Sequence, residues 1–368
     1  MNVLITLLAL GVYGAHALPG NNPRMSSLFA DTIMKTREGL RVGNHTHGNV
    51  NGWPCFSKYC KPPTDMKYKR LQNVSPRVQW MNAGGYCGSM AIQDVSLGKG
   101  VWISQQQVRD HTVPGGGHDN EILATNVEKA LKNLKLTYEA FDYKTEPVPQ
   151  ADAYRTFLKK HLVQGNGIAW MIMLEGGCYP VYPGLPYGFY SHVEPVYGIY
   201  SNHPLTDDGK WYDDDIIVHG TDADTHSYYR RFDSLPAGVN SHNCSECGGG
   251  YVGYPCIDKD YGFGYAITGL NDEKEGLPLS LAVDDPEEPN TREGQKPKPL
   301  HATVSVSGIS EGGKYTIYRW NDVDSAFDVS KASSSHNFVG GANAEYVYKD
   351  PSTILSNSTT YYRCYEEQ

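Results

Sequence analysis

The sequence predicts an α+β fold, with helices first and an antiparallel sheet after them, followed by a small all-β C-terminal domain. Two observations carry this prediction. Apolar residues recur at the helical period up to about residue 163 and at the strand period from residue 167 onward. A second group of alternating segments follows an acidic, proline-rich stretch at residues 276–300, which we interpret as a linker. Helices before strands within one domain, here residues 76–275, are typical of the α+β class.

The first residues predict a secretory signal peptide over residues 1–17. An apolar run from Val3 to Val12 precedes an Ala-His-Ala site that ends at Ala17. The run is shorter than the ~20 residues that a membrane span requires, so we expect a secreted protein. Residues 18–75 are polar and lack periodic signals, and we expect them to form a loop-rich N-terminal arm.

Helices are expected where apolar residues repeat every three or four positions. The first follows Gly88 and ends at Gly98, and Ser104 is placed to cap the second. The expected helices cover residues 88–97, 105–111, 119–133 and 152–163.

Strands are expected where apolar runs are short or alternate with polar residues. In the first domain they cover residues 167–174, 193–200, 215–218 and 262–268. In the C-terminal β domain, residues 301–368, they cover residues 301–307, 315–320 and 360–364.

The net charge of the chain limits the classes of partner that it is expected to bind. The net charge is −9 and the pI about 5.8. Nucleic acids and anionic membranes are bound by basic surfaces, so we expect neither as a partner. The charge is compatible with a peptide or protein substrate. We expect no cofactor and no resident metal. The run Asp213–Asp215 permits calcium binding, but it also fits the solvated start of a strand.

Eight cysteines in a secreted chain make disulfides possible. If Cys87 is free, seven remain, and a second cysteine must be unpaired or must pair between chains. Zinc binding by His242, Cys244, Cys247 and Cys256 is an alternative that an oxidising compartment disfavours. Acceptor sites for N-glycans stand at Asn44, Asn73, Asn243 and Asn357.

Cys87 is the strongest candidate functional residue. It lies between the glycine-rich segment around Gly84 and the start of the first expected helix. The free N–H groups and the dipole at a helix N-terminus favour negative charge, so a cysteine there is a candidate thiolate nucleophile. The alternatives are a buried capping cysteine or one half of a disulfide.

A thiol nucleophile requires a base and a group that orients the base. His192 is the candidate base because it stands at the expected start of the strand over 193–200. The next strand ends in a loop that offers the third group. Asp222 is the preferred orienting carboxylate, with His219 and Asp224 as competitors.

The order of a helix-borne Cys87, a strand-borne His192 and then Asp222 resembles the papain-like cysteine peptidase superfamily. The Cys87-Gly88 pair looks most similar to its branch that processes double-glycine leader peptides. In that family a glutamine about six residues before the cysteine completes the oxyanion hole, and here that position is Met81. Gln79 and Asn82 flank it, and either amide could donate to an oxyanion.

The resemblance covers about residues 75–270 and implies a papain-like cysteine-hydrolase core with Cys87 as nucleophile, His192 as general acid and base, and Asp222 as orienter. The expected function is therefore a secreted thiol protease or related hydrolase that cleaves a peptide or amide bond through a cysteine thioester. The alternative is a non-catalytic secreted glycoprotein of the same fold that serves as an extracellular binding or matrix component. High tyrosine and glycine contents and the missing glutamine favour the alternative.

Overall fold

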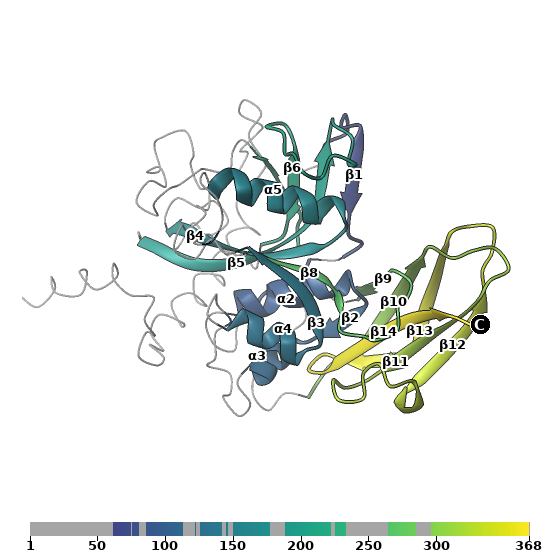
Figure 1. Ribbon diagram of the computed structural model, residues 1–368. Coiled ribbons are helices and arrows are strands. Elements are labelled where there is room, and N and C mark those ends of the chain that lie inside the picture. The colour runs from purple at the N-terminus through teal and green to yellow at the C-terminus, as the bar shows by residue number, and fades with distance from the viewer. Residues whose placement is uncertain are drawn as a thin grey trace, which may run out of the picture.

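The computed structural model describes the chain in eleven segments: residues 62–74, 76–80, 86–112, 122, 126–141, 145, 150–176, 188–221, 225–232, 264–284 and 296–367. Within them the fold is mixed α/β, with four α-helices and three sheets (Figure 1). All pairs of strands in these sheets are antiparallel.

The four helices match the helical periods of the sequence. They are α2 (Cys87–Leu97), α3 (Gln105–Thr112), α4 (Val127–Asn133) and α5 (Gln150–Val163). Gly98 terminates α2, and the Ser104 hydroxyl accepts a hydrogen bond from the Gln107 N–H at 3.2 Å, which confirms the expected cap of α3. The helix expected over residues 119–133 begins only at Val127, with Asn126 as its N-cap, and Ile122 is not helical; residues 119–121 and 123–125 lie outside the described residues.

The largest sheet has seven strands in the order β3-β8-β4-β5-β6-β7, with β1 paired to β5. Its strands are β1 (Tyr68–Leu71), β3 (Leu136–Phe141), β4 (Gly167–Gly176), β5 (Gly188–Ser201), β6 (Ile216–His219), β7 (Tyr228–Arg231) and β8 (Gly264–Leu270). Of these, β4, β5, β6 and β8 correspond to the strands expected in the first domain.

Helices cover both faces of this sheet, as Figure 1 shows for α5 on one side and α2, α3 and α4 on the other. The alternation of side chains along β4 separates two apolar clusters. Ile168, Trp170 and Ile172 pack in the cluster on the α5 face, whereas Ala169 and Met171 pack in the cluster on the α2 face. The central strands β4 and β5 are therefore buried from both sides.

The other two sheets form the C-terminal part of the fold, in the orders β13-β10-β9 and β12-β11-β14-β2. Their strands are β2 (Val101–Ile103), β9 (Leu279–Val283), β10 (Pro299–Ser307), β11 (Lys314–Trp320), β12 (Ser334–Val339), β13 (Glu345–Leu355) and β14 (Thr359–Glu366). Strands β10, β11 and β14 match the strands expected there.

The structure differs from the linker expected over residues 276–300, because part of it is the strand β9. The side chains of Leu279, Leu281 and Val283 alternate into the core, and β9 pairs with β10. A further link joins the two parts of the chain, since β2 follows α2 and pairs with β14 at the C-terminal end. Among the described residues, none of the helices has the length and hydropathy of a membrane-spanning segment.

Candidate active site

Cys87 is the first residue of α2 and is 3% exposed. The N-cap residue Tyr86 makes no capping hydrogen bond with its side chain, and the first turn of α2 contains no acidic residue. Within α2 itself, therefore, no capping side chain and no acidic side chain of the first turn offsets the positive end of the helix beside the sulfur. The guanidinium carbon of Arg109 lies 3.3 Å from the centre of the Tyr86 ring, which adds a second positive group next to this helix end.

Gly88 is required by the packing of the helix N-terminus. A Cβ at this position would lie 2.1 Å from the carbonyl oxygen of Ile122, and no side chain fits at that distance. The glycine that follows Cys87 therefore has a local steric cause, independent of any peptidase branch.

The segment over residues 76–80 lies along α2 and α3. The Arg77 N–H donates to Asp94 of α2 at 3.0 Å, and the Trp80 N–H donates to Gln105 Oε1 of α3 at 2.8 Å. Gln105 Nε2 in turn donates to the Val78 carbonyl at 2.9 Å. These bonds fix the backbone on both sides of Gln79.

Gln79 is 1% exposed, and neither its amide nitrogen nor its amide oxygen has a hydrogen-bond partner in the part of the chain that the structure describes. A buried amide costs free energy unless water or a ligand satisfies it, so Gln79 is a candidate to contact a bound molecule. The adjacent Trp80 ring lies 5.9 Å from the Tyr86 ring, centre to centre, and Tyr86 immediately precedes Cys87. Asn82, the other expected oxyanion donor, lies outside the described residues.

His192 lies within β5 rather than at the start of a strand, and it is 1% exposed. The sequence placed the strand start too late because polar and aromatic residues precede His192. In the register of β4 and β5, His192 pairs with Ile172, and Val193 pairs with Met171. Val193 therefore faces the apolar cluster that contains Cys87, and His192 follows the opposite alternation on the same strand.

Glu194 lies at the centre of a buried polar group on the α5 side of the sheet. Its carboxylate accepts a hydrogen bond from Trp170 Nε1 at 3.3 Å and lies 3.1 Å from His219 Nδ1. Arg230 Nη2 lies 4.0 Å from the same oxygen, and His192 Nε2 lies 3.8 Å from the other one. Burial acts to raise the pKa of Glu194, but His219, Arg230 and His192 together lower it to about 2.

The proton positions in this group follow from its donors. Arg230 Nε can only donate, and it lies 2.7 Å from His219 Nε2, so this nitrogen accepts and carries no proton. His219 is therefore neutral, with its proton on Nδ1 near Glu194. Burial also lowers the pKa of His219, and it lowers the pKa of His192 to about 4 against the opposing effect of Glu194.

Of the three residues expected to orient His192, one lies among the described residues. Asp222 and Asp224 lie outside the described residues. His219 is described, and its two ring nitrogens are engaged by Glu194 and Arg230. Sequence reasoning missed Glu194, although its position two residues after His192 on an apolar strand places both side chains on one face.

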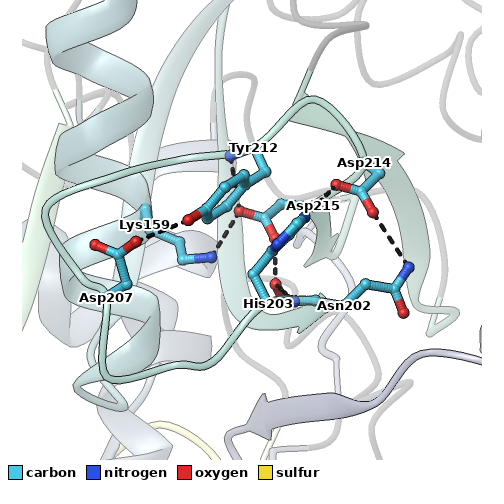
Figure 2. Close-up of polar contacts among 8 residues, drawn as sticks. Lys159, Asn202, His203, Asp207, Tyr212, Asp214 and Asp215 are labelled. Carbon is cyan, nitrogen blue, oxygen red and sulfur yellow. Dashed lines mark hydrogen bonds and ion pairs between the residues drawn. The ribbon is translucent and has the colours of Figure 1, made fainter.

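Two residues of the acidic run, Asp214 and Asp215, hold the loop between β5 and β6, as Figure 2 shows. Asp215 forms a fully buried ion pair with Lys159 of α5 at 2.6 Å. Asp214 accepts a hydrogen bond from Asn202 at 3.1 Å and lies 3.0 Å from His203 Nε2. Within the described parts of the chain, no group of three or more His, Cys, Asp or Glu side chains is arranged to hold a metal ion.

Two cysteines are described, Cys87 and Cys364; both are buried, and neither is in a disulfide. Burial raises the pKa of the Cys364 thiol to about 12. The other six cysteines, including the proposed zinc ligands, lie outside the described residues. Of the glycan acceptors, Asn73 and Asn357 are described and exposed, and Asn44 and Asn243 lie outside the described residues.

Comparisons with known proteins give only weak similarities. No family model and no curated protein matches the chain. Among solved structures, a clostridial cysteine protease, Cwp84, after propeptide cleavage is 9% identical, with 80% of this chain and 82% of that chain covered and a TM-score of 0.29. The cysteine protease and lectin-like domains of Cwp84, a surface-layer-associated protein of Clostridium difficile, are 10% identical, with 92% and 83% covered and a TM-score of 0.26. TM-scores this low do not establish a shared fold, and neither match supports the double-glycine branch.

Proposed function

We propose that this protein is a secreted, papain-like cysteine hydrolase that cleaves a peptide or amide bond. The observation that carries the proposal is the place of Cys87, which is in no disulfide, at the first position of α2, next to the segment that buries the Gln79 amide, which has no hydrogen-bond partner among the described residues. Both features are costly in a purely structural role, and both are useful for forming and stabilising negative charge.

From its place on the opposite face of β5, the His192 ring has to turn toward Cys87. In the proposed reaction it then accepts the proton of the Cys87 thiol, and the thiolate attacks the carbonyl carbon of the substrate. The backbone N–H of Cys87 and the amide of Gln79 or Asn82 donate to the oxyanion that forms. The C–N bond then breaks, His192 gives its proton to the leaving amine, and a thioester remains on Cys87. Water, activated by His192, hydrolyses the thioester and releases the acid.

Asp222 is the orienting residue in the proposal. Strand β6 runs antiparallel to β5, so that Ile216 pairs with Tyr200 and the Gly220 N–H donates to the Pro195 carbonyl at 2.9 Å. The direction of β6 therefore carries the chain from Tyr200 toward the end of β5 that holds His192. This direction supports a third residue from the loop that follows His219.

The test is cleavage of a peptide library by the purified protein and by two cysteine variants. Cys87→Ala is expected to abolish cleavage, whereas Cys364→Ala serves as the control because Cys364 is also free and buried. Gln79→Ala is expected to lower kcat by about 10²- to 10³-fold, the usual loss for one oxyanion donor. Cleavage that survives in Cys87→Ala would refute the proposal.

A second candidate is a non-catalytic secreted glycoprotein that uses this fold as a binding or matrix component. It is favoured by the complete burial of Glu194, His219 and Arg230, because a closed polar network also serves to specify a core. The exposed acceptors Asn73 and Asn357 fit a glycoprotein as well. Folded protein that cleaves no member of the library and leaves Cys87 unmodified by iodoacetamide would favour this candidate.

A further inference from the structure

An open groove lies near the C-terminal end of α2, at the opposite end of this helix from Cys87. It has a volume of about 610 Å³ and is lined by β1 with Lys67 before it, by the last residue of α5, and by the loop that follows β5. Gln72, which follows β1, lies beside Gly98 at the end of α2. Helix α2 has 11 residues, so its two ends are about 15 Å apart. The groove is therefore separate from the candidate active site.

The groove carries cations that have no counter-ion among the described residues. Lys67, Lys69 and Arg70 line it, and all three are exposed and form no ion pair with a described residue. Burial and the neighbouring charge of Arg70 lower the pKa of Lys99 to about 8, as expected where cations gather without a carboxylate. The chain as a whole has a net charge of −9, so this cluster is a local reversal of its charge. The groove therefore presents positive charge to an anionic group.

The turn after α5 fixes the place of two of these cations. Gly165 has a φ of +78°, and a Cβ at this position would lie 3.0 Å from Arg70 Nε. Lys99 Nζ donates to Asn166 Oδ1 at 2.7 Å and lies 3.4 Å from the Gly165 carbonyl oxygen. The C-terminal end of a helix carries a partial charge of about −0.5, which does not balance two cations.

The acidic residues nearest in sequence do not line the groove. Asp207 accepts a hydrogen bond from the Tyr212 hydroxyl at 2.8 Å, and Asp208 lies 3.5 Å from Gln164 Nε2. Neither carboxylate therefore serves as the counter-ion of the lysines on β1.

Strand β1 has an open backbone edge beside these cations. Among the described strands it pairs with β5 alone. The Gln72 N–H donates to the Tyr197 carbonyl at 2.9 Å, so by the alternation of an antiparallel ladder the backbone groups of Lys69 and Leu71 point away from β5. Such an edge can accept a further strand. The edges of two copies of this chain carry the same lysines and repel each other, which disfavours a second copy as the added strand.

We propose that this groove binds an extended acidic peptide, which adds to the open edge of β1 and places its carboxylates against Lys67, Lys69 and Arg70. Apolar side chains of the same peptide pack on Val163 and Leu205, which also line the groove. Apolar contacts and backbone pairing favour a peptide over a sulfated polysaccharide, which offers neither. The inference does not depend on the chemistry at Cys87.

The first experiment measures the Kd of the full-length protein for a fluorescein-labelled peptide of about eight residues, glutamate alternating with valine, by fluorescence anisotropy. Each exposed charge contact changes an affinity by about two- to fivefold. The double variant Lys67→Glu and Lys69→Glu is therefore expected to raise the Kd by about tenfold or more. The affinity of the unmodified protein is expected to fall as the ionic strength rises.

The matched control is the double variant Lys129→Glu and Lys349→Glu, which changes the net charge equally at exposed lysines of α4 and β13. Its Kd is expected to stay within about twofold of the unmodified value. An unchanged Kd in the Lys67 and Lys69 variant, or an equal loss in the control, would overturn the proposal.

A second set of measurements uses only the unmodified protein, so it does not depend on how any variant folds. A peptide of alternating lysine and valine, and the glutamate peptide with an N-methylated backbone, are both expected to bind at least about tenfold more weakly. Equal binding of either peptide would overturn the proposal. Binding of heparin without binding of the glutamate peptide would assign the groove to a polysaccharide, and would overturn it as well.

Discussion

Replacing Lys159 by methionine tests the claim that the ion pair between Lys159 of α5 and Asp215 stabilises the loop between β5 and β6. Lys159 Nζ lies 2.6 Å from Asp215 Oδ2, and neither side chain is exposed to solvent. Removing one partner of a buried ion pair leaves an uncompensated charge and costs about 3–5 kcal/mol. Asp215 also accepts hydrogen bonds from Ser201 Oγ and the Tyr212 N–H, as Figure 2 shows in part. These bonds survive in Lys159→Met, so we expect a loss near the lower limit, about 3 kcal/mol.

The assay is urea unfolding at pH 7, with Lys159→Met, Asp215→Asn and the double variant compared in one thermodynamic cycle. The double variant removes both charges, so it is expected to cost less than the sum of the single variants by at least about 2 kcal/mol. The matched control is Lys132→Met, which breaks an exposed pair with Glu128 at 3.2 Å. An exposed pair contributes less than about 1 kcal/mol. The reasoning is refuted if Lys159→Met lowers the free energy of unfolding no more than Lys132→Met does. It is also refuted if the losses of the two single variants sum to the loss of the double variant.

Two further predictions concern α2. Gly88→Ala is expected to destabilise the protein by about 1–3 kcal/mol in urea unfolding, because the new Cβ would meet the Ile122 carbonyl oxygen and this clash outweighs the better helix propensity of alanine. Gly209→Ala is the control, since no atom lies within 4 Å of a Cβ placed there. Equal losses of stability in the two variants would contradict the packing described at Gly88. Burial raises the pKa of Asp94 from 3.8 to about 8, so the unfolded chain loses this proton first as the pH rises. The contribution of Asp94 to the free energy of unfolding is complete below pH 4 and falls by roughly 1 kcal/mol per pH unit as the pH rises toward 8. Asp94→Asn is expected to remove this dependence of the unfolding free energy on pH. An unchanged dependence in the variant would contradict the assignment.

The sequence predicted the elements whose apolar period is strong and local. Helix α2 and strand β4 are examples, since each buries a continuous apolar surface and ends at a recognisable residue or turn. Strand β9 was missed because its three buried side chains lie beside an acidic, proline-rich stretch, and its partner β10 lies beyond that stretch. Strand β2 has only three residues, and it forms a ladder only because β14, more than 250 residues away, lies next to it.

The candidate site was predictable in its residue types and less so in their contacts. The position of Cys87 at a helix start follows from the glycines and the periodic residues after it, and the structure places it there. Asp215 looked like a solvated strand entry because its partner Lys159 is 56 residues away, on a helix that packs only in three dimensions. The burial of Glu194 was not predictable from β5 alone, because its partners Trp170, His219 and Arg230 lie on three other strands of the sheet.

The assignment of Cys87 as nucleophile and His192 as base is tested most directly by acylation with an activated ester such as p-nitrophenyl acetate, followed by intact-protein mass spectrometry. The predicted result is a single acetyl group on Cys87 that forms rapidly, disappears by hydrolysis, and forms far more slowly in His192→Ala. Cys364 provides the internal control, because it is free and buried and should stay unmodified. An acetyl group found elsewhere, or one that forms on Cys87 at the same rate in His192→Ala, would contradict the assignment.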